Sequence, residues 1–111
     1  MARLPNPDNA VVEIGKLHDY CLNPLHPRGR NKARVFASVL DLTADDAEIL
    51  RQRLLLAAIS EEAALAEQDE YGQRYMLDFE METEAASATI RSGWIVRREE
   101  DFPRFTSCWI L

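Results

Sequence analysis

The stretch that decides the fold is GQRYMLDFEME, residues 72–82. Its large apolar side chains recur at every second position, at Tyr75, Leu77, Phe79 and Met81, and polar or charged residues fill most of the positions between them. Alternation with a period of two is typical of a strand that buries one face. The stretch therefore predicts a half-buried β-strand.

Two further strands are expected downstream of this stretch. Residues 88–98 alternate in the same way, and residues 103–110 place Phe105 and Trp109 on an apolar face. The turns between the three segments are short, and short connections make neighbouring strands antiparallel. The second half of the chain therefore predicts an antiparallel sheet.

Upstream of the strands, apolar residues recur at helical spacing in three segments. We expect helices over residues 13–22, 32–40 and 44–59. Asn31 is the predicted N-cap of the second helix. Thr43 is the predicted N-cap of the third, because an aspartate follows it three residues later.

The acidic, alanine-rich segment 61–70 either prolongs the third helix or forms an exposed linker. Helices followed by a run of strands are typical of an α+β fold with the helices on one face of the sheet. The length suits one domain. The sequence thus predicts a single α+β domain, residues 1–111, with N-terminal helices packed on one face of a three- to four-stranded antiparallel sheet.

The composition is that of a globular protein. Of 111 residues, 47% are hydrophobic and 29% are charged, values that do not favour disorder. No apolar run reaches the roughly 18 residues of a membrane span, and the N-terminus lacks the apolar core of a signal peptide. Cys21 and Cys108 are too few for a disulfide scaffold, so we expect reduced thiols in a cytoplasmic protein without a membrane partner or a cofactor.

The net charge of −6 is concentrated in the middle of the chain. Residues 43–90 carry twelve acids and three bases, whereas residues 1–42 carry four acids and six bases. A negative potential repels phosphate backbones in general. Screening limits the reach of distant charges to about 8–10 Å, so the four bases within residues 28–34 can still bind one anion.

The segment HPRGRNK, residues 26–32, is the first candidate site. It brings an imidazole and three cations to the start of a predicted helix, where free backbone N–H groups favour anions. Arg28, Arg30 and Lys32 suit phosphate oxygens, and His26 can transfer protons near neutral pH. Together these groups fit phosphodiester cleavage. The alternative is a solvated turn whose arginines pair with acids downstream.

The outward face of the predicted sheet is the second candidate site. A mixture of acids, bases and hydroxyls across three strands can form a shallow site. The alternative is a hydrated face with cross-strand ion pairs, each worth about 0.2–1 kcal/mol. The residues expected on this face are Asp78, Glu80, Thr89, Arg91, Arg104 and Thr106.

Other chemistry-bearing residues are expected to be structural. No cysteine or histidine pair has zinc spacing, so we expect no metal site. Cys21 lies on the apolar stripe of the first helix and is expected in the core. Trp94 and Trp109 are expected as core or interface anchors, although an aromatic ring can also stack on a base. No phosphate-binding glycine loop occurs.

Several short motifs together resemble a known family. They are Leu4-Pro5-Asn6; Lys16-Leu17 with Tyr20 and Leu22; His26-Pro27-Arg28-Gly29-Arg30 with Lys32-Ala33 and Phe36; Tyr71-Gly72 with Tyr75; Trp94-Ile95; and Pro103-Arg104-Phe105-Thr106. The pattern resembles a small bacterial domain family of unknown function, found alone or beside toxin–antitoxin and phage-related genes. It covers about the whole chain. That family is in turn remotely similar to the barnase–EndoU–colicin–RelE class of metal-independent ribonucleases.

This resemblance implies helices before a small antiparallel sheet, and attack of a ribose 2′-hydroxyl on the adjacent phosphate. Two features depart from the pattern: Asp41 stands where a glycine is more usual, and the net charge is negative. The implied roles are His26 as general base or acid; Arg28, Arg30 and Lys32 as phosphate clamps, with Arg30 and Lys32 in the catalytic group; and Arg104 and Thr106 as further anion-binding residues.

Three functional hypotheses follow. The first, which we favour, is a toxin-like ribonuclease of a toxin–antitoxin or phage-related system, with RNA as substrate and a protein antitoxin as inhibitor. The second is a non-enzymatic interaction protein, such as an antitoxin or immunity protein, whose acidic middle mimics or shields against nucleic acid. The third is a structural homodimer that pairs through its sheet or its apolar C-terminal edge at Trp109.

Overall fold

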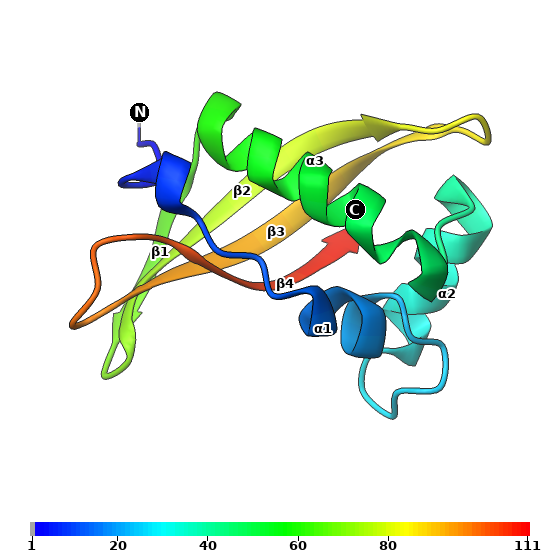
Figure 1. Ribbon diagram of the computed structural model, residues 1–111, viewed down its shortest axis with the longest axis horizontal. Helices are drawn as coiled ribbons and strands as arrows, with labels where there is room; N and C mark the ends of the chain where they lie inside the picture. Colours follow the sequence, from blue (N-terminus) through cyan, green and yellow to red (C-terminus); the bar gives the residue numbers. More distant parts are fainter. Residues whose placement is uncertain (1) are drawn as a thin grey trace.

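The computed structural model describes residues 2–111 and shows helical elements followed by a four-stranded sheet (Figure 1). The helical elements are η1 (Pro7–Asn9), α1 (Ile14–Lys16), η2 (Leu17–Cys21), α2 (Arg30–Leu40), η3 (Ala44–Asp46) and α3 (Ala47–Ser60). The strands are β1 (Ala64–Asp69), β2 (Gly72–Glu82), β3 (Ser87–Arg97) and β4 (Arg104–Ile110). Each strand pairs antiparallel with the next, in the order β1-β2-β3-β4. The predicted α+β class is confirmed.

One face of the sheet is buried under the helices (Figure 1). α3 packs on β2, while η2 and α2 pack on β4. Of the alternating residues of β2, Leu77, Phe79 and Met81 are buried as predicted, and Tyr75 is half-buried against the same core. The helix expected over residues 13–22 is α1, continued by the wider π-helical turn η2. The other face of the sheet, called the open face below, is turned away from the helices.

The segment 61–70, expected as helix or linker, contains strand β1 instead. Its turn into β2 is closed by the Asp69 carboxylate, which accepts the N–H groups of Tyr71 at 2.9 Å and Gly72 at 3.3 Å. Gly72 has a φ of 150°, which glycine adopts at the least cost. Nearly all side chains of β1 are exposed, so no apolar alternation marks the strand in the sequence.

A bulge in β4 reverses the expected orientation of Trp109. The register between β3 and β4 shifts at this point, and Thr106 is the extra residue. An extra residue moves every later side chain to the other face of the strand. Phe105 and Cys108 are therefore both buried in the core. Trp109 pairs with Arg91 of β3, and its side chain lies on the open face. The prediction that Phe105 and Trp109 share one face is wrong.

The starts of α2 and α3 follow different local rules. Thr43 and Asp46 form the predicted capping box, in which the Thr43 N–H donates to the Asp46 carboxylate at 2.9 Å. α2 begins one residue before Asn31, with Gly29 as its N-cap, so the predicted cap at Asn31 is wrong. Glycine at position 29 allows the loop to pass close to Tyr20, because a Cβ there would lie 2.6 Å from the Tyr20 carbonyl oxygen.

Candidate functional site

The first predicted site is the loop of residues 26–32, where His26 has a structural role. Its Nδ1 accepts the backbone N–H groups of Arg28 and Gly29, at 3.0 and 3.1 Å. A ring nitrogen that accepts hydrogen bonds carries no proton, so the neutral ring is protonated on Nε2. The ring also packs edge-on against Tyr20, with centroids 4.6 Å apart. His26 therefore orders the loop, and Nε2 is the ring nitrogen left to face a ligand.

The three predicted cations of this loop are placed differently. Arg28 and Arg30 are exposed, and among residues 2–111 no ion pair involves them or Lys32. Lys32 extends from α2 to β4, where its Nζ lies 4.4 Å from the centroid of the Trp109 ring. The ring face attracts this ammonium group through its quadrupole. Of the three cations, Lys32 thus contacts β4, whereas Arg28 and Arg30 face solvent.

The second predicted site, the open face, carries cross-strand polar pairs. Arg91 on β3 donates two hydrogen bonds to Asp78 on β2, each 2.9 Å long. Next to them, Thr89 donates to Glu80. Hydrogen bonding from Arg91 holds the pKa of Asp78 below its ordinary value. These four residues face outward as predicted, and they satisfy one another across the strands.

Two further arginines are held by carboxylates. Arg104 donates to both carboxylate oxygens of Glu100, at 2.8 and 2.9 Å, and lies 3.8 Å from Glu13. Arg74 donates to Asp69 at 2.8 Å. These hydrogen bonds lower the pKa values of Glu100 and Asp69. Arg104, predicted to bind an anion, is thus already paired with the protein's own acids.

A hollow of about 170 Å³ on the open face lies where the two predicted sites approach each other. Thr106 and Trp109 line it from β4, and Glu67 lines it from β1. A Cβ at Gly93 would lie 2.7 Å from the Thr106 Oγ1, so the glycine makes room for this hydroxyl. Lys32 lies over the ring of Trp109, so a cation of the first predicted site contacts a residue that lines this hollow.

A wider hollow of about 790 Å³ adjoins the first, because Met76 lines both. It extends over the Asp78–Arg91 pair toward β1 and the residues before it. The two hollows together are called the open-face groove below. None of the predicted loop residues His26, Arg28, Arg30 and Lys32 lines it. Lys32 is linked to it only through its contact with Trp109.

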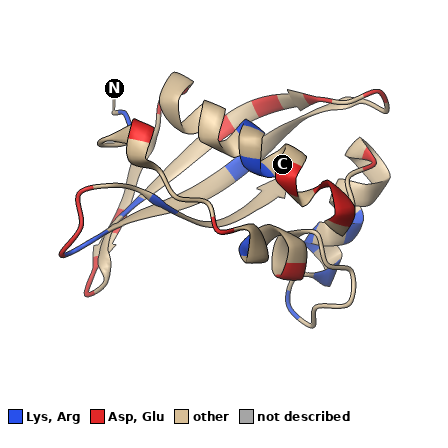
Figure 2. Ribbon diagram, viewed as in Figure 1, with Lys and Arg blue, Asp and Glu red and all other residues tan. Residues whose placement is uncertain are grey.

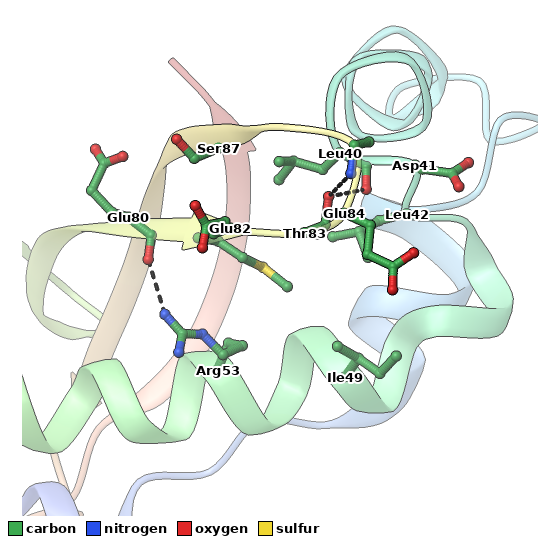
Figure 3. Close-up of a pocket in the computed structure, with 12 residues that line it drawn as sticks. Leu40, Asp41, Leu42, Ile49, Arg53, Glu80, Glu82, Thr83, Glu84 and Ser87 are labelled. Atoms are coloured by element: carbon green, nitrogen blue, oxygen red, sulfur yellow. Dashed lines mark hydrogen bonds between the residues drawn. The ribbon is translucent and has the colours of Figure 1, made fainter.

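A third hollow, of about 750 Å³, lies between the end of α2, α3 and the β2–β3 hairpin (Figure 3). The exposed carboxylates of Asp41, Glu82 and Glu84 surround it. Arg53 crosses it from α3 and donates to the Glu80 carbonyl oxygen at 2.9 Å. This acid-rimmed pocket was missed from the sequence, although the excess of acids in residues 43–90 was its signal.

Two cysteines, Cys108 on β4 and Cys21 on η2, are buried in the core. Cys21, at the end of η2, has its Sγ 3.9 Å from the Ser107 Oγ, and both Cys21 and Cys108 are free thiols. Hydrogen bonding with the Cys108 thiol lowers the pKa of Cys21 to about 7, against the opposing effect of burial. Burial raises the pKa of Cys108. The expected core position of Cys21 is confirmed, and its pairing with Cys108 depends on contacts between distant segments.

Charge is unevenly distributed over the surface (Figure 2). Acidic residues occupy the hairpin ends and the start of α3, whereas lysine and arginine gather on α2 and on the strands. Within residues 2–111, no three histidine, cysteine or acidic side chains gather as a metal site would require. No helix in the described part of the chain has the length and apolar character to cross a membrane.

Comparison with known proteins places the chain in a family. Residues 3–111 match the family model described as "Domain of unknown function (DUF6883)". The chain belongs to this family. A match over nearly the whole chain agrees with the predicted membership of a domain family of unknown function.

Among solved structures, the chain is similar to one in the "Contact-dependent growth inhibition toxin - immunity protein complex from Klebsiella pneumoniae 342". The TM-score is 0.66 at 16% sequence identity, and the alignment covers 94% of this chain and 95% of the other. At this identity the similarity establishes a shared fold. No curated protein sequence matches the chain.

Proposed function

We propose that this protein is a ribonuclease-like toxin domain of a toxin–immunity system and that RNA binds in the open-face groove. The observation that carries the proposal is that Thr106 and Trp109 line the small hollow of that groove and that the Lys32 Nζ lies over the Trp109 ring. A ring face, a cation and a hydroxyl are suited to a base, a phosphate and a phosphate oxygen. The fold shared with a chain of a toxin–immunity complex supports the choice of system.

The binding mode follows from these three side chains. A base stacks on the Trp109 ring, and the adjacent phosphate lies between the Lys32 Nζ and the Thr106 Oγ1. Lys32 is the suitable cation because, within residues 2–111, no carboxylate forms an ion pair with it, whereas the arginines of the open face are each paired with an acid. A single strand fits this arrangement because its bases are free to stack.

The proposed reaction is an internal transfer at phosphorus. The ribose 2′-oxygen bonds to phosphorus while the bond from phosphorus to the 5′-oxygen breaks, which leaves a 2′,3′-cyclic phosphate and a 5′-hydroxyl. Glu67, the carboxylate that lines the small hollow, accepts the 2′-hydroxyl proton. Lys32 stabilises the charge on the phosphate and gives a proton to the leaving oxygen. His26 is the competing assignment for a proton-transfer group.

Cleavage of a fluorescent single-stranded RNA tests the proposal. We expect cyclic-phosphate products, and a rate that falls about 10²–10⁴-fold in Glu67→Gln and in Lys32→Ala, since each removes a proton-transfer group. Arg34→Ala is the matched control, because it removes another exposed cation of α2 and should leave the rate unchanged. Intact RNA at all protein concentrations, or equal losses in the control, would contradict the proposal.

His26→Ala separates the two assignments of the proton-transfer group. If Glu67 is the base, this variant loses loop order but retains cleavage at a rate above that of Glu67→Gln. If cleavage vanishes in His26→Ala and persists in Glu67→Gln, the base is His26. Expression of the native chain should arrest growth, whereas expression of whichever of the two variants has lost RNA cleavage should not.

A non-enzymatic immunity-type role is the second candidate, and the acidic charge favours it. The excess of acids in residues 43–90 suits a protein that binds a basic partner or competes with nucleic acid for it. Under this alternative the purified chain leaves RNA intact and forms a stoichiometric complex with the product of a neighbouring gene. The same RNA assay therefore decides between the two candidates.

A further inference from the structure

The outer face of α3 exposes a stripe of large apolar side chains. Ile49, Leu56 and Ile59 are 55%, 54% and 48% exposed, and their spacing places them along one side of the helix. The opposite side of α3 is buried in the core, through Leu50, Leu54, Ala57 and Ala58. The exposed Gln52 lies between Ile49 and Leu56 on the outer side, so this side combines polar and large apolar side chains, as contact surfaces do.

The apolar stripe runs into the acid-rimmed pocket. Ile49 lines that pocket from α3 (Figure 3). Asp41, Glu82 and Glu84 stand around it, exposed, and among residues 2–111 none of them forms an ion pair. The stripe and the pocket together, called the α3 surface below, therefore combine apolar side chains with three carboxylates that make no ion pair. The one cation that lines the pocket, Arg53, donates to the Glu80 carbonyl oxygen.

The negative charge of the α3 surface indicates which kind of partner can bind there. A second copy docking by the same surface would bring carboxylates against carboxylates, which is repulsive. An anionic lipid surface would be repelled for the same reason. A partner with lysine or arginine beside large apolar side chains satisfies both properties, because its apolar groups cover the stripe while its cations pair with the acids.

We propose that the α3 surface docks a partner protein through a cationic amphipathic helix. The acid-rimmed pocket lies on the helical side of the sheet, whereas the small hollow lined by Thr106 and Trp109 lies on the open face. A partner bound at the α3 surface therefore leaves this small hollow accessible. The proposal does not depend on RNA cleavage, and the partner it describes is one that carries or positions the chain instead of blocking this hollow.

Binding of a synthetic amphipathic helix of leucine and lysine tests the proposal. We expect saturable binding by the intact chain, with amide chemical-shift changes at α3 and the β2–β3 hairpin. A helix with glutamate in place of lysine should not bind. Leu56→Gln, and separately the pair Glu82→Gln with Glu84→Gln, should each raise Kd at least about tenfold, which corresponds to about 1.4 kcal/mol.

Two controls separate this surface from nonspecific attraction. Leu25→Gln changes an apolar side chain that is 87% exposed in another region, and Glu99→Gln removes an exposed acid of the β3–β4 turn. Neither should change Kd, and thermal unfolding confirms that each variant folds. Equal losses in the controls, or shift changes confined to the open face, overturn the proposal. A dimer in solution that Leu56→Gln dissociates also overturns it, since the occupant is then a second copy.

Discussion

Asp41 ends α2 in the left-handed region, with a φ of 56° and a ψ of 34°. This backbone conformation brings a side chain close to its own carbonyl oxygen, so it is costly for any residue except glycine. Asp41 makes no ion pair among residues 2–111 that would offset the cost. The same residue stands at the rim of the acid-rimmed pocket, where its carboxylate adds to the negative charge.

Asp41→Gly should therefore stabilise the protein. We expect the free energy of unfolding to rise by roughly 0.5–1 kcal/mol, because relief of the left-handed strain exceeds the added entropy of glycine in the unfolded chain. Urea denaturation at neutral pH measures the change. A midpoint that falls would show that the Asp41 carboxylate stabilises the end of α2 by more than its strain costs.

Ser92 is the one buried polar residue of the described core. Its hydroxyl donates to the Leu77 carbonyl oxygen at 2.8 Å and accepts from the Trp94 Nε1 at 2.9 Å. Ser92→Ala leaves the buried indole N–H without its acceptor, so we expect a loss of about 1–3 kcal/mol in the free energy of unfolding. Ser38→Ala, at an exposed position of α2, is the control and should change the midpoint of denaturation little.

The residues of the candidate site were predicted from the sequence only in part. Lys32 and Thr106 were both predicted as anion-binding residues; Thr106 lines the open-face groove, and Lys32 contacts Trp109, which also lines it. Trp109, which lies beneath Lys32, was expected as a core or interface anchor or as a base-stacking ring, and strict alternation placed it wrongly on the same face as Phe105. His26 was predicted as a proton-transfer group from its residue type, its place among the loop cations and the family resemblance, and its contacts with the backbone of its own loop could not be seen in its spacing.

At the scale of elements, the bulge in β4 positions both Thr106 and Trp109. The bulge brings Thr106 over Gly93, where a Cβ would lie 2.7 Å from the Thr106 Oγ1. Gly93→Ala should displace the hydroxyl or the strand, with a loss of about 1–3 kcal/mol in stability. Under the proposed function it should also slow RNA cleavage.

Gly15→Ala is the matched control for this prediction. At Gly15, on α1, a Cβ would meet the Asp19 carboxylate at an ordinary 3.4 Å, and alanine favours the helix by up to about 1 kcal/mol. We expect this variant to be as stable as the native protein or more so. Differential scanning calorimetry of the two variants compares them directly, and equal destabilisation would show that the bulge tolerates a Cβ.

For the molecule as a whole, stability should fall in acid. Asp69 and Asp78, with an ordinary pKa of 3.8, and Glu100, with one of 4.5, all have lowered pKa values in the folded state because arginines donate hydrogen bonds to them. A lowered folded-state pKa stabilises the fold above the unfolded-state value, and that contribution disappears as the pH falls through the folded-state value. We expect urea midpoints to fall progressively below about pH 4.5.

Arg91→Gln should flatten this acid dependence by removing the partner of Asp78. The unfolding midpoint of the variant should be lower than that of the native protein at pH 7 and should approach it at low pH, where the Asp78 carboxyl is protonated in both. Parallel curves across the whole range would show that the Asp78–Arg91 pair contributes nothing to the pH dependence.

The sequence by itself determined those features that depend on short-range pattern. The alternation within residues 72–82 predicted a half-buried strand, the spacing of Thr43 and Asp46 predicted a capping box, and the order of segments predicted helices packed on an antiparallel sheet. Each follows from which side of an element meets water or from a contact within one helical turn. Such information is contained in neighbouring residues.

Only the tertiary structure decided the strand over residues 64–69, the orientation of Trp109 and the meeting of Lys32 with that ring. The strand depends on hydrogen bonds to β2, because its exposed side chains give no pattern. The orientation depends on one extra residue in the pairing of β4 with β3. The contact joins residues from α2 and β4, far apart in the chain. Pairing partners and long-range contacts minimise the energy of the whole fold, so a local window does not contain them.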